Sequence, residues 1–185
     1  MSIRESDPIE LTAELAGRAA DIALVVFDVD GTLTDGMLHY HSDGSETKSF
    51  HVHDGHGLKS LAGHGIRVAL MTARSSSIVA ARAAELGIDD VFQGVADKRQ
   101  CLQRLAERHG IALARCAYMG DDLPDLPAMS VVGLACAPAD AHPRIATAAH
   151  WRSRHAGGRG AARELCDLLV AIAERKTATI SDRSP

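Results

Sequence analysis

The stretch Ala23-Leu-Val-Val-Phe-Asp-Val-Asp-Gly-Thr-Leu-Thr-Asp35 decides the fold, because an apolar run ends there in two carboxylates and a glycine. Five of the six residues from Ile22 to Phe27 are aliphatic, which is typical of a strand buried on both faces of a parallel sheet. Asp28 and Asp30 follow at its carboxyl end and need a cation, a hydrogen-bond donor or bulk water. Since ligands bind at that edge of open α/β sheets, the stretch predicts a functional site.

The composition is that of one ordinary domain, spanning residues 1–185 and large enough to bury a core. Hydrophobic residues make up 46% of the chain and charged residues 24%, as in a typical globular protein. Aromatic residues make up only 3% and the formal net charge is −4, so stacking rings for nucleic acid are scarce and no basic stripe is visible in the sequence. We therefore expect no nucleic-acid partner.

The cellular compartment is predicted from the cysteines and from the apolar runs. The four cysteines are widely spaced and form no Cys-x-x-Cys pair, which favours buried free thiols in a reducing compartment. The polar N-terminus lacks the apolar core of a signal peptide. No apolar run approaches the about 20 residues that span a bilayer. We expect a cytoplasmic protein with no membrane partner.

Strands and helices are expected to alternate along the chain. Apolar periodicity predicts helices over 9–20, 58–63, 75–86, 98–109 and 161–175, and strands over 66–72, 91–93, 116–120 and 131–135. This order predicts an α/β fold, with a Rossmann-like parallel sheet between two layers of helices. Two alternating segments around Asp43-Gly44 predict a β-hairpin flap at about 36–53. Residues 176–185 have little apolar content and are predicted to be disordered.

Polar side chains follow three of the predicted strands and should converge at one edge of the sheet. Asp28 and Asp121 would supply oxygen ligands for Mg²⁺, and Thr72 and Lys98 would hold phosphate oxygens. Asp28 could attack phosphorus to form an aspartyl-phosphate. Asp30 could protonate the leaving alkoxide and then activate water. The set therefore predicts phosphoryl transfer.

These residues resemble the motifs of the haloacid dehalogenase-like phosphohydrolases. The matching motifs are Asp28-Val-Asp30-Gly-Thr32, Thr72 after an apolar strand, Lys98, and Gly120-Asp121-Asp122-x-x-Asp125. The resemblance implies that the Asp28 carboxylate, the Asp30 main-chain carbonyl and Asp121 hold Mg²⁺. It also implies that Asp28 is the nucleophile and Asp30 the acid/base, while Asp122 and Asp125 support the site from outside the ligand set.

The chain further resembles the small capless group that contains 3-deoxy-D-manno-octulosonate 8-phosphate phosphatase. The hairpin followed by Asp54-Gly55-His56-Gly57 and the segment Gly157-Gly-Arg-Gly160 carry this resemblance. It implies hydrolysis of an acidic sugar phosphate in lipopolysaccharide precursor synthesis and a homotetramer joined through the hairpins. The glycine-rich segment would approach a neighbour's active site. The implied substrate contacts are Asp30, His51, Val52, His53, Asp54, Gly55, Lys59, Arg74, Arg82 and Lys98.

Alternative interpretations accompany these expectations. The substrate could be a nine-carbon, sialic-acid-like sugar phosphate, or the chain could be a catalytically idle oligomerisation or regulatory module. Arg74 and Arg82 would share a helical face with Ile78, where Arg82 could equally be solvated. Asp121 and Asp122 could cap the following turn. The glycines at 157, 158 and 160 could form a plain loop. The histidines at 39, 41, 51, 53 and 56 are expected at the solvent or at an interface, because no partner set completes a zinc site.

Overall fold

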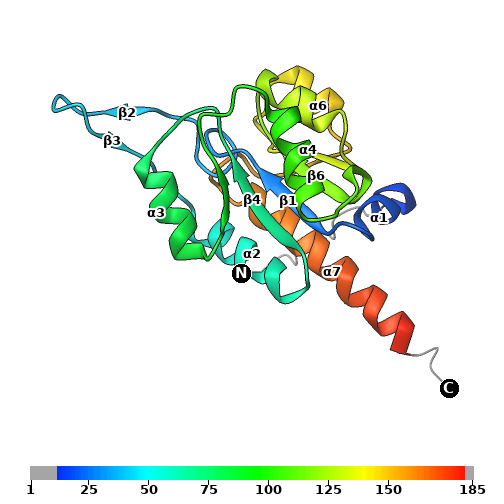
Figure 1. The fold of residues 1–185 in the computed structure, drawn as a ribbon. Coiled ribbons are helices and arrows are strands. Elements are labelled where there is room, and N and C mark those ends of the chain that lie inside the picture. The colour runs from blue at the N-terminus through cyan, green and yellow to red at the C-terminus, as the bar shows by residue number, and fades with distance from the viewer. Residues whose placement is uncertain (1–11, 182–185) are drawn as a thin grey trace, which may run out of the picture.

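Six parallel strands form the centre of the computed structural model, which describes residues 12–181 (Figure 1). Their order across the sheet is β5-β4-β1-β6-β7-β8, and β1 lies between β4 and β6 with Leu24 opposite Arg67 and Cys116. The strands are β1 (Leu24–Phe27), β4 (Arg67–Met71), β5 (Asp90–Phe92), β6 (Cys116–Met119), β7 (Leu134–Ala137) and β8 (Trp151–Arg152).

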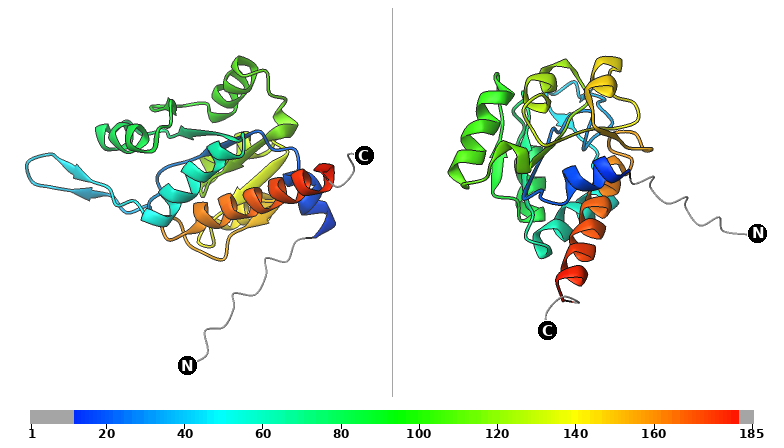
Figure 2. Two further views of the ribbon diagram at one scale, coloured as in Figure 1. Left: turned by 90° about the horizontal axis from the view of Figure 1, so that it is seen from below. Right: turned by 90° about the vertical axis from the view of Figure 1, so that its right-hand side faces the viewer.

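Helices cover both faces of this sheet, which confirms the predicted α/β class (Figures 1 and 2). Val25 and Phe27 of β1 pack into the core on the side of α1, α2, α3 and α7, whereas Leu24 and Val26 pack into the core on the side of α4, α5 and α6. The helices are α1 (Ala13–Ala19), α2 (Val52–Gly63), α3 (Ser77–Leu86), α4 (Lys98–Arg108), α5 (Leu126–Met129), α6 (Pro143–Ala148) and α7 (Ala161–Ser181).

A two-stranded hairpin projects from one end of the molecule (Figures 1 and 2). It consists of β2 (His39–Tyr40) and β3 (Glu46–Thr47), which pair antiparallel. The predicted boundary at 53 was wrong, because α2 begins at Val52 rather than at 58. The His51 side chain caps that helix by accepting from the His53 backbone N–H at 3.3 Å. The alternation of apolar and polar residues after Thr47 predicted a strand, although the helix α2 already begins at Val52.

Two further boundaries differ from the prediction. The strand expected at 131–135 is β7 at Leu134–Ala137, because Ser130 and Val131 close the turn after α5 through backbone bonds to Leu126 and Ala128. Helix α7 continues to Ser181, so the expected disorder of 176–181 was wrong; Lys176 lies 2.6 Å from Asp21. Residues 182–185, and the first part of the helix expected over 9–20, lie outside the described residues.

The cysteines, which all lie in the described part of the chain, form no disulfide bond. All four cysteines are free, and three of them, at 116, 136 and 166, are buried. Among residues 12–181, no helix combines the length and the apolar character needed to cross a membrane.

Candidate active site

The predicted site lies where the carboxyl ends of β1, β4 and β6 meet. The chain leaves β1 toward β4 and later returns to the opposite side of β1 as β6, so the strand order reverses at this point, as at the ligand sites of open α/β sheets. A cavity of about 270 Å³ opens there. It is lined by Asp28, Asp30, Gly36, Thr72, Ala73, Arg74, Lys98, Asp121, Asp122, Pro124 and Asp125.

The turn after β1 interlocks with the loop after β6. Gly31 has a φ of 93°, and a Cβ placed on it would lie 2.1 Å from Oδ2 of Asp121. The Thr32 hydroxyl donates to Oδ1 of the same carboxylate at 3.3 Å. Glycine is therefore required at position 31 both by the backbone conformation and by the close approach of Asp121.

Lys98 holds two carboxylates together beneath the cavity. It is the first residue of α4, whose N-terminus Asp97 caps by accepting from Gln100 N–H at 2.9 Å. The Lys98 ammonium, only 4% exposed, lies 2.7 Å from Oδ1 of Asp28 and 2.6 Å from Oδ1 of Asp125. Burial lowers the pKa of Lys98, but the two carboxylate charges outweigh it and raise that pKa above its usual value. Lys98 is therefore a cation at this site.

Asp125 is saturated with hydrogen bonds and supports the site from behind. Its Oδ1 accepts from Lys98 and from the Tyr118 hydroxyl, the latter at 2.8 Å. Its Oδ2 accepts from the backbone N–H groups of Asp121 at 3.1 Å and Asp122 at 3.2 Å. Asp122 caps the 3-10 turn Leu123–Asp125. Asp122 therefore forms the cap that the alternative interpretation expected, and the supporting roles of both residues stay predictions.

The carboxylates at the cavity carry more negative charge than Lys98 balances. Oxygens of Asp28, Asp121 and Asp125 lie within 4.8 Å of one another. Burial, followed by the charge of Asp125, raises the pKa of Asp28 to about 8. The same two causes raise the pKa of Asp121 to about 6. Hard oxygen donors short of positive charge fit Mg²⁺, and because Asp125 is saturated, Asp28 and Asp121 are the carboxylates left to bind it.

Asp30 is held by a residue that the sequence did not predict. Its Oδ2 accepts from the Thr72 hydroxyl at 3.3 Å, and its Oδ1 contacts the ammonium of Lys48. The Lys48 side chain is only 3% exposed. Lys48 follows β3 in a segment without a recognisable motif, and only the folding of the hairpin base against the turn brings it to Asp30. No sequence signal marked it.

Comparison with known proteins identifies the family. Residues 87–165 match a family described as haloacid dehalogenase-like hydrolase. The 3-deoxy-D-manno-octulosonate 8-phosphate phosphatase KdsC of Escherichia coli K12 is 43% identical over 160 residues, which cover 86% of this chain and 85% of the relative. The chain belongs to the 3-deoxy-D-manno-octulosonate 8-phosphate phosphatase family.

Solved structures agree with this assignment. The Moraxella catarrhalis phosphatase of the same name, in complex with magnesium, phosphate and 3-deoxy-D-manno-octulosonate (KDO), is 40% identical with a TM-score of 0.86, covering 92% of this chain and 98% of that one. A hypothetical protein of Xanthomonas campestris is 48% identical with a TM-score of 0.89, covering 99% of this chain and 100% of that one.

In this member of the KDO 8-phosphate phosphatase family, Arg74 lies at the rim of the cavity. The expectation that it shares a helical face with Arg82 was wrong, because α3 begins only at Ser77. Its guanidinium donates to the Tyr40 hydroxyl at 2.7 Å and lies 3.8 Å from Glu46. Among the described residues, the Arg74 Nε is the buried side-chain polar atom without a hydrogen-bond partner. Arg74 therefore ties the rim of the cavity to both strands of the hairpin.

Asp54, Gly55 and Arg82 do not line the cavity within the chain. The buried Asp54 carboxylate accepts from the backbone N–H groups of Gly160 at 3.2 Å and Arg163 at 2.8 Å, so it caps α7. Arg82 covers Gly55, where a Cβ would lie 2.2 Å from its Nη2. It also pairs with Glu85 at 2.7 Å. These three expected substrate contacts are instead engaged in the packing of α2, α3 and α7.

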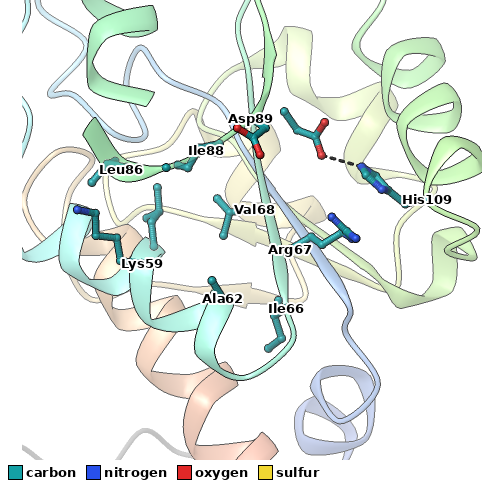
Figure 3. Close-up of a pocket in the computed structure, with 12 residues that line it drawn as sticks. Lys59, Ala62, Ile66, Arg67, Val68, Leu86, Ile88, Asp89 and His109 are labelled. Atoms are coloured by element: carbon teal, nitrogen blue, oxygen red, sulfur yellow. Dashed lines mark hydrogen bonds and ion pairs between the residues drawn. The ribbon is translucent and has the colours of Figure 1, made fainter. Parts of the chain in front are cut away.

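Lys59 lies on the rim of a different pocket, of about 300 Å³, between α2, α3 and the start of β4 (Figure 3). Figure 3 shows it across an apolar floor from Arg67. His51, Val52 and His53 lie at the start of α2 outside the cavity, and Val52 is 77% exposed. The histidine rings at 51 and 53 meet edge to face at 4.9 Å. Within residues 12–181, no histidine belongs to a group that could hold a metal ion.

The glycine-rich segment packs against the turn after β1 of its own chain. A Cβ on Gly157 would lie 1.9 Å from the carbonyl oxygen of Gly31. The Gly158 N–H donates to the Thr32 carbonyl at 2.9 Å. Its close packing on residues 31–34 explains why this segment contains glycines.

Proposed function

We propose that this chain hydrolyses 3-deoxy-D-manno-octulosonate 8-phosphate to KDO and phosphate, through an aspartyl-phosphate on Asp28. It is a phosphatase that acts on an acidic sugar phosphate. The observation that carries the proposal is the placement of Asp28, which directly follows β1 at the cavity while Lys98 holds one of its oxygens. The relative solved with magnesium, phosphate and KDO supports the sugar.

In the first step, Asp28 forms a bond to phosphorus as the bond to the sugar oxygen breaks. Lys98 keeps the Asp28 carboxylate in place. The Thr72 hydroxyl lines the cavity and donates to Asp30 in this structure, and it would turn to donate to a phosphoryl oxygen once substrate binds. Asp30 donates a proton to the departing sugar oxygen, which is needed because an alkoxide is a poor leaving group.

In the second step, Asp30 takes a proton from water as the water attacks the phosphorus of the aspartyl-phosphate. Phosphate leaves and the Asp28 carboxylate is restored. Asp28, Asp121 and the Asp30 carbonyl would hold Mg²⁺, which when bound supplies positive charge for the phosphoryl oxygens.

We propose that Arg74 binds the anionic sugar. It lines the cavity, and its buried Nε has no partner in the described residues. The guanidinium is suited to a carboxylate, which it can bind through two parallel hydrogen bonds. His51, Val52, His53, Asp54, Gly55, Lys59 and Arg82 would reach substrate only if a neighbouring subunit or a movement of α2 brought them to it.

We also propose that the hairpins join four copies of the chain. Met37 and Tyr40 are each 63% exposed and Leu38 is 45% exposed, so this hairpin presents large apolar side chains to the surroundings. Exposed apolar side chains gathered in one place are typical of contact surfaces between proteins. The cytoplasmic location, and the role in lipopolysaccharide precursor synthesis, stay predictions.

Phosphate release from a panel of sugar phosphates, with and without Mg²⁺, tests the function. We expect KDO 8-phosphate to give the highest kcat/KM, and activity to vanish when Mg²⁺ is chelated. A higher kcat/KM with a nine-carbon, sialic-acid-like sugar phosphate would assign the chain to that substrate. Failure to hydrolyse any member of the panel would favour the catalytically idle module. The presence of Asp28, Asp30, Lys98 and Asp121 argues against that alternative.

A further inference from the structure

We propose that Lys48 is a positioning residue for the acid/base Asp30, and that the hairpin base is thereby part of the catalytic machinery. The inference deepens the proposed function and rests on it. It starts from a contact: the ammonium of Lys48 lies against Oδ1 of Asp30, although the two residues are 18 positions apart.

The burial of Lys48 indicates a specific role for this contact. A lysine side chain loses much rotamer freedom on burial, and its charge needs a partner, so lysine is almost never fully buried unless paired. The side chain of Lys48 is nonetheless only 3% exposed, and it meets the carboxylate of Asp30. Exposed ion pairs on a hairpin contribute little to stability, but this pair is shielded from solvent on the lysine side.

Lys48 acts from behind Asp30 rather than from within the cavity. Asp30 lines the cavity, whereas Lys48 is not among the residues that line it. Lys48 contacts Oδ1, and the opposite oxygen, Oδ2, lies beside the hydroxyl of Thr72, which does line the cavity. The lysine therefore fixes the rotation of the carboxylate and selects Oδ2 as the oxygen that faces the substrate.

The hairpin is tied to the site at a second point, which holds Lys48 in register. Arg74 donates to the Tyr40 hydroxyl of β2 at 2.7 Å and lies 3.8 Å from Glu46 of β3. The segment that carries Lys48 is thus anchored on both strands of the hairpin. A misplacement of about 1 Å at an acid/base group can lower a rate about 100-fold, so such anchoring matters for Asp30.

The test compares Lys48→Met and Lys48→Arg with the wild type in pre-steady-state hydrolysis of p-nitrophenyl phosphate and steady-state hydrolysis of KDO 8-phosphate. p-Nitrophenolate leaves without a proton, so phosphorylation of Asp28 by this substrate does not need Asp30. Hydrolysis of the aspartyl-phosphate still does. We expect Lys48→Met to keep the rapid first release of p-nitrophenol but to slow later turnovers, so that a burst appears.

With KDO 8-phosphate, we expect Lys48→Met to lower kcat by at least about tenfold with little change in KM, because the lost interaction acts in the transition state. Lys48→Arg should recover much of the loss. Lys176→Met, which removes a lysine paired with Asp21 far from the site, serves as the matched control and should behave as wild type.

A first turnover slowed as much as the steady state would overturn the inference, because general damage to the site slows both. An unchanged kcat with KDO 8-phosphate would overturn it as well. If the wild type releases p-nitrophenol but does not hydrolyse KDO 8-phosphate, only the proposed sugar is contradicted, and the burst comparison still decides the role of Lys48.

Discussion

At the scale of single residues, the site places the negative charges of several carboxylates around the positive charge of one buried lysine. Asp28, Asp121 and Asp125 surround a small volume, and Lys98 reaches two of them. The remaining negative charge raises the pKa of Asp28 to about 8 and that of Asp121 to about 6. The metal-free site therefore retains protons that a cation would displace.

This charge balance predicts how pH affects stability. The folded protein holds protons on Asp28 and Asp121 that the unfolded chain releases near pH 3.8, so metal-free stability should fall as pH rises from about 4 to about 8. Mg²⁺ competes with those protons and should raise the melting temperature more at about pH 8 than at about pH 5.5. Thermal unfolding in chelator and in Mg²⁺ measures both effects. If Mg²⁺ raised the melting temperature equally at the two pH values, the assignment of Asp28 and Asp121 as its ligands would be contradicted.

The Lys98 cation should contribute strongly to the stability of the folded protein. Replacing it by methionine leaves Asp28 and Asp125 close together without their cation, and breaking a buried pair in this way costs about 3–5 kcal/mol. We expect a loss of that size in urea unfolding at about pH 8, and a smaller loss at about pH 5, where Asp28 is protonated. Phosphatase activity should vanish. A variant as stable as wild type at both pH values would show that the pair is not buried as described.

The sequence predicts the site residues that follow strands, and Lys98 at the start of a helix, but it does not predict Lys48. Asp28, Thr72 and Asp121 were predicted to converge because the carboxyl ends of parallel strands share an edge. The position of Lys48 depends on how the hairpin base folds back onto the turn, which no local pattern encodes. For Asp54 the sequence prediction and the structure differ in the opposite way. Its segment indicated the family and predicted a substrate contact, but its carboxylate caps α7 instead of facing the cavity.

At the scale of elements, the fold is determined by how loops stack beneath the site. The segment before α7 lies on the turn after β1, and that turn lies on Asp121: Gly157 meets the Gly31 carbonyl, and Gly31 meets the Asp121 carboxylate. Two glycines thus allow three loops to approach within backbone contact. The position of Asp121 depends on a segment more than thirty residues further along the chain.

Gly157→Ala should displace this stack. Its Cβ would overlap the Gly31 carbonyl at 1.9 Å, so the turn must move. We expect a loss of about 1–3 kcal/mol in stability and a fall in kcat of about tenfold or more. Gly63→Ala in α2, where a Cβ meets nothing within 4 Å, is the control and should leave both unchanged or slightly improve stability. Equal behaviour of the two variants in urea unfolding and turnover would refute the stacking argument.

The elements that the sequence predicted well are those with strong local signals. Gly87 ends α3 in the left-handed conformation with a φ of 70°, and Asp97 caps α4, as the residue types suggest. Helix α6 and strand β8 were not predicted, because their short segments carry few apolar residues. Their positions follow from packing: Ile145 and Trp151 are buried, and β8 pairs with β7.

At the scale of the whole molecule, the hairpin projects away from the body while its base reaches the site (Figure 2). The chain therefore carries the exposed apolar side chains of Met37, Leu38 and Tyr40 on the same hairpin as the lysine that contacts Asp30. If the hairpins associate as we propose, assembly would hold Lys48 and Arg74 in place, and activity would depend on the oligomer.

Removing apolar side chains from the hairpin tests this dependence. Met37→Ser combined with Leu38→Ser removes two exposed apolar side chains at the base of the hairpin and leaves Lys48 and Arg74 unsubstituted. We expect light scattering to fall from about four times the 19.6 kDa chain mass toward a single chain, with a lower kcat at low protein concentration. A wild-type monomer would rule out the tetramer, and a dissociated variant with full kcat would separate assembly from catalysis.

The most direct test of the central claim is to look for the phosphoryl group on Asp28. Wild-type protein with Mg²⁺ and KDO 8-phosphate is quenched in acid within the first turnovers, digested and analysed by mass spectrometry. We predict one phosphoryl group on the peptide that contains Asp28, and neither labelling nor KDO release with Asp28→Asn. Full turnover by Asp28→Asn, with no phosphorylated peptide from the wild type, would contradict the account.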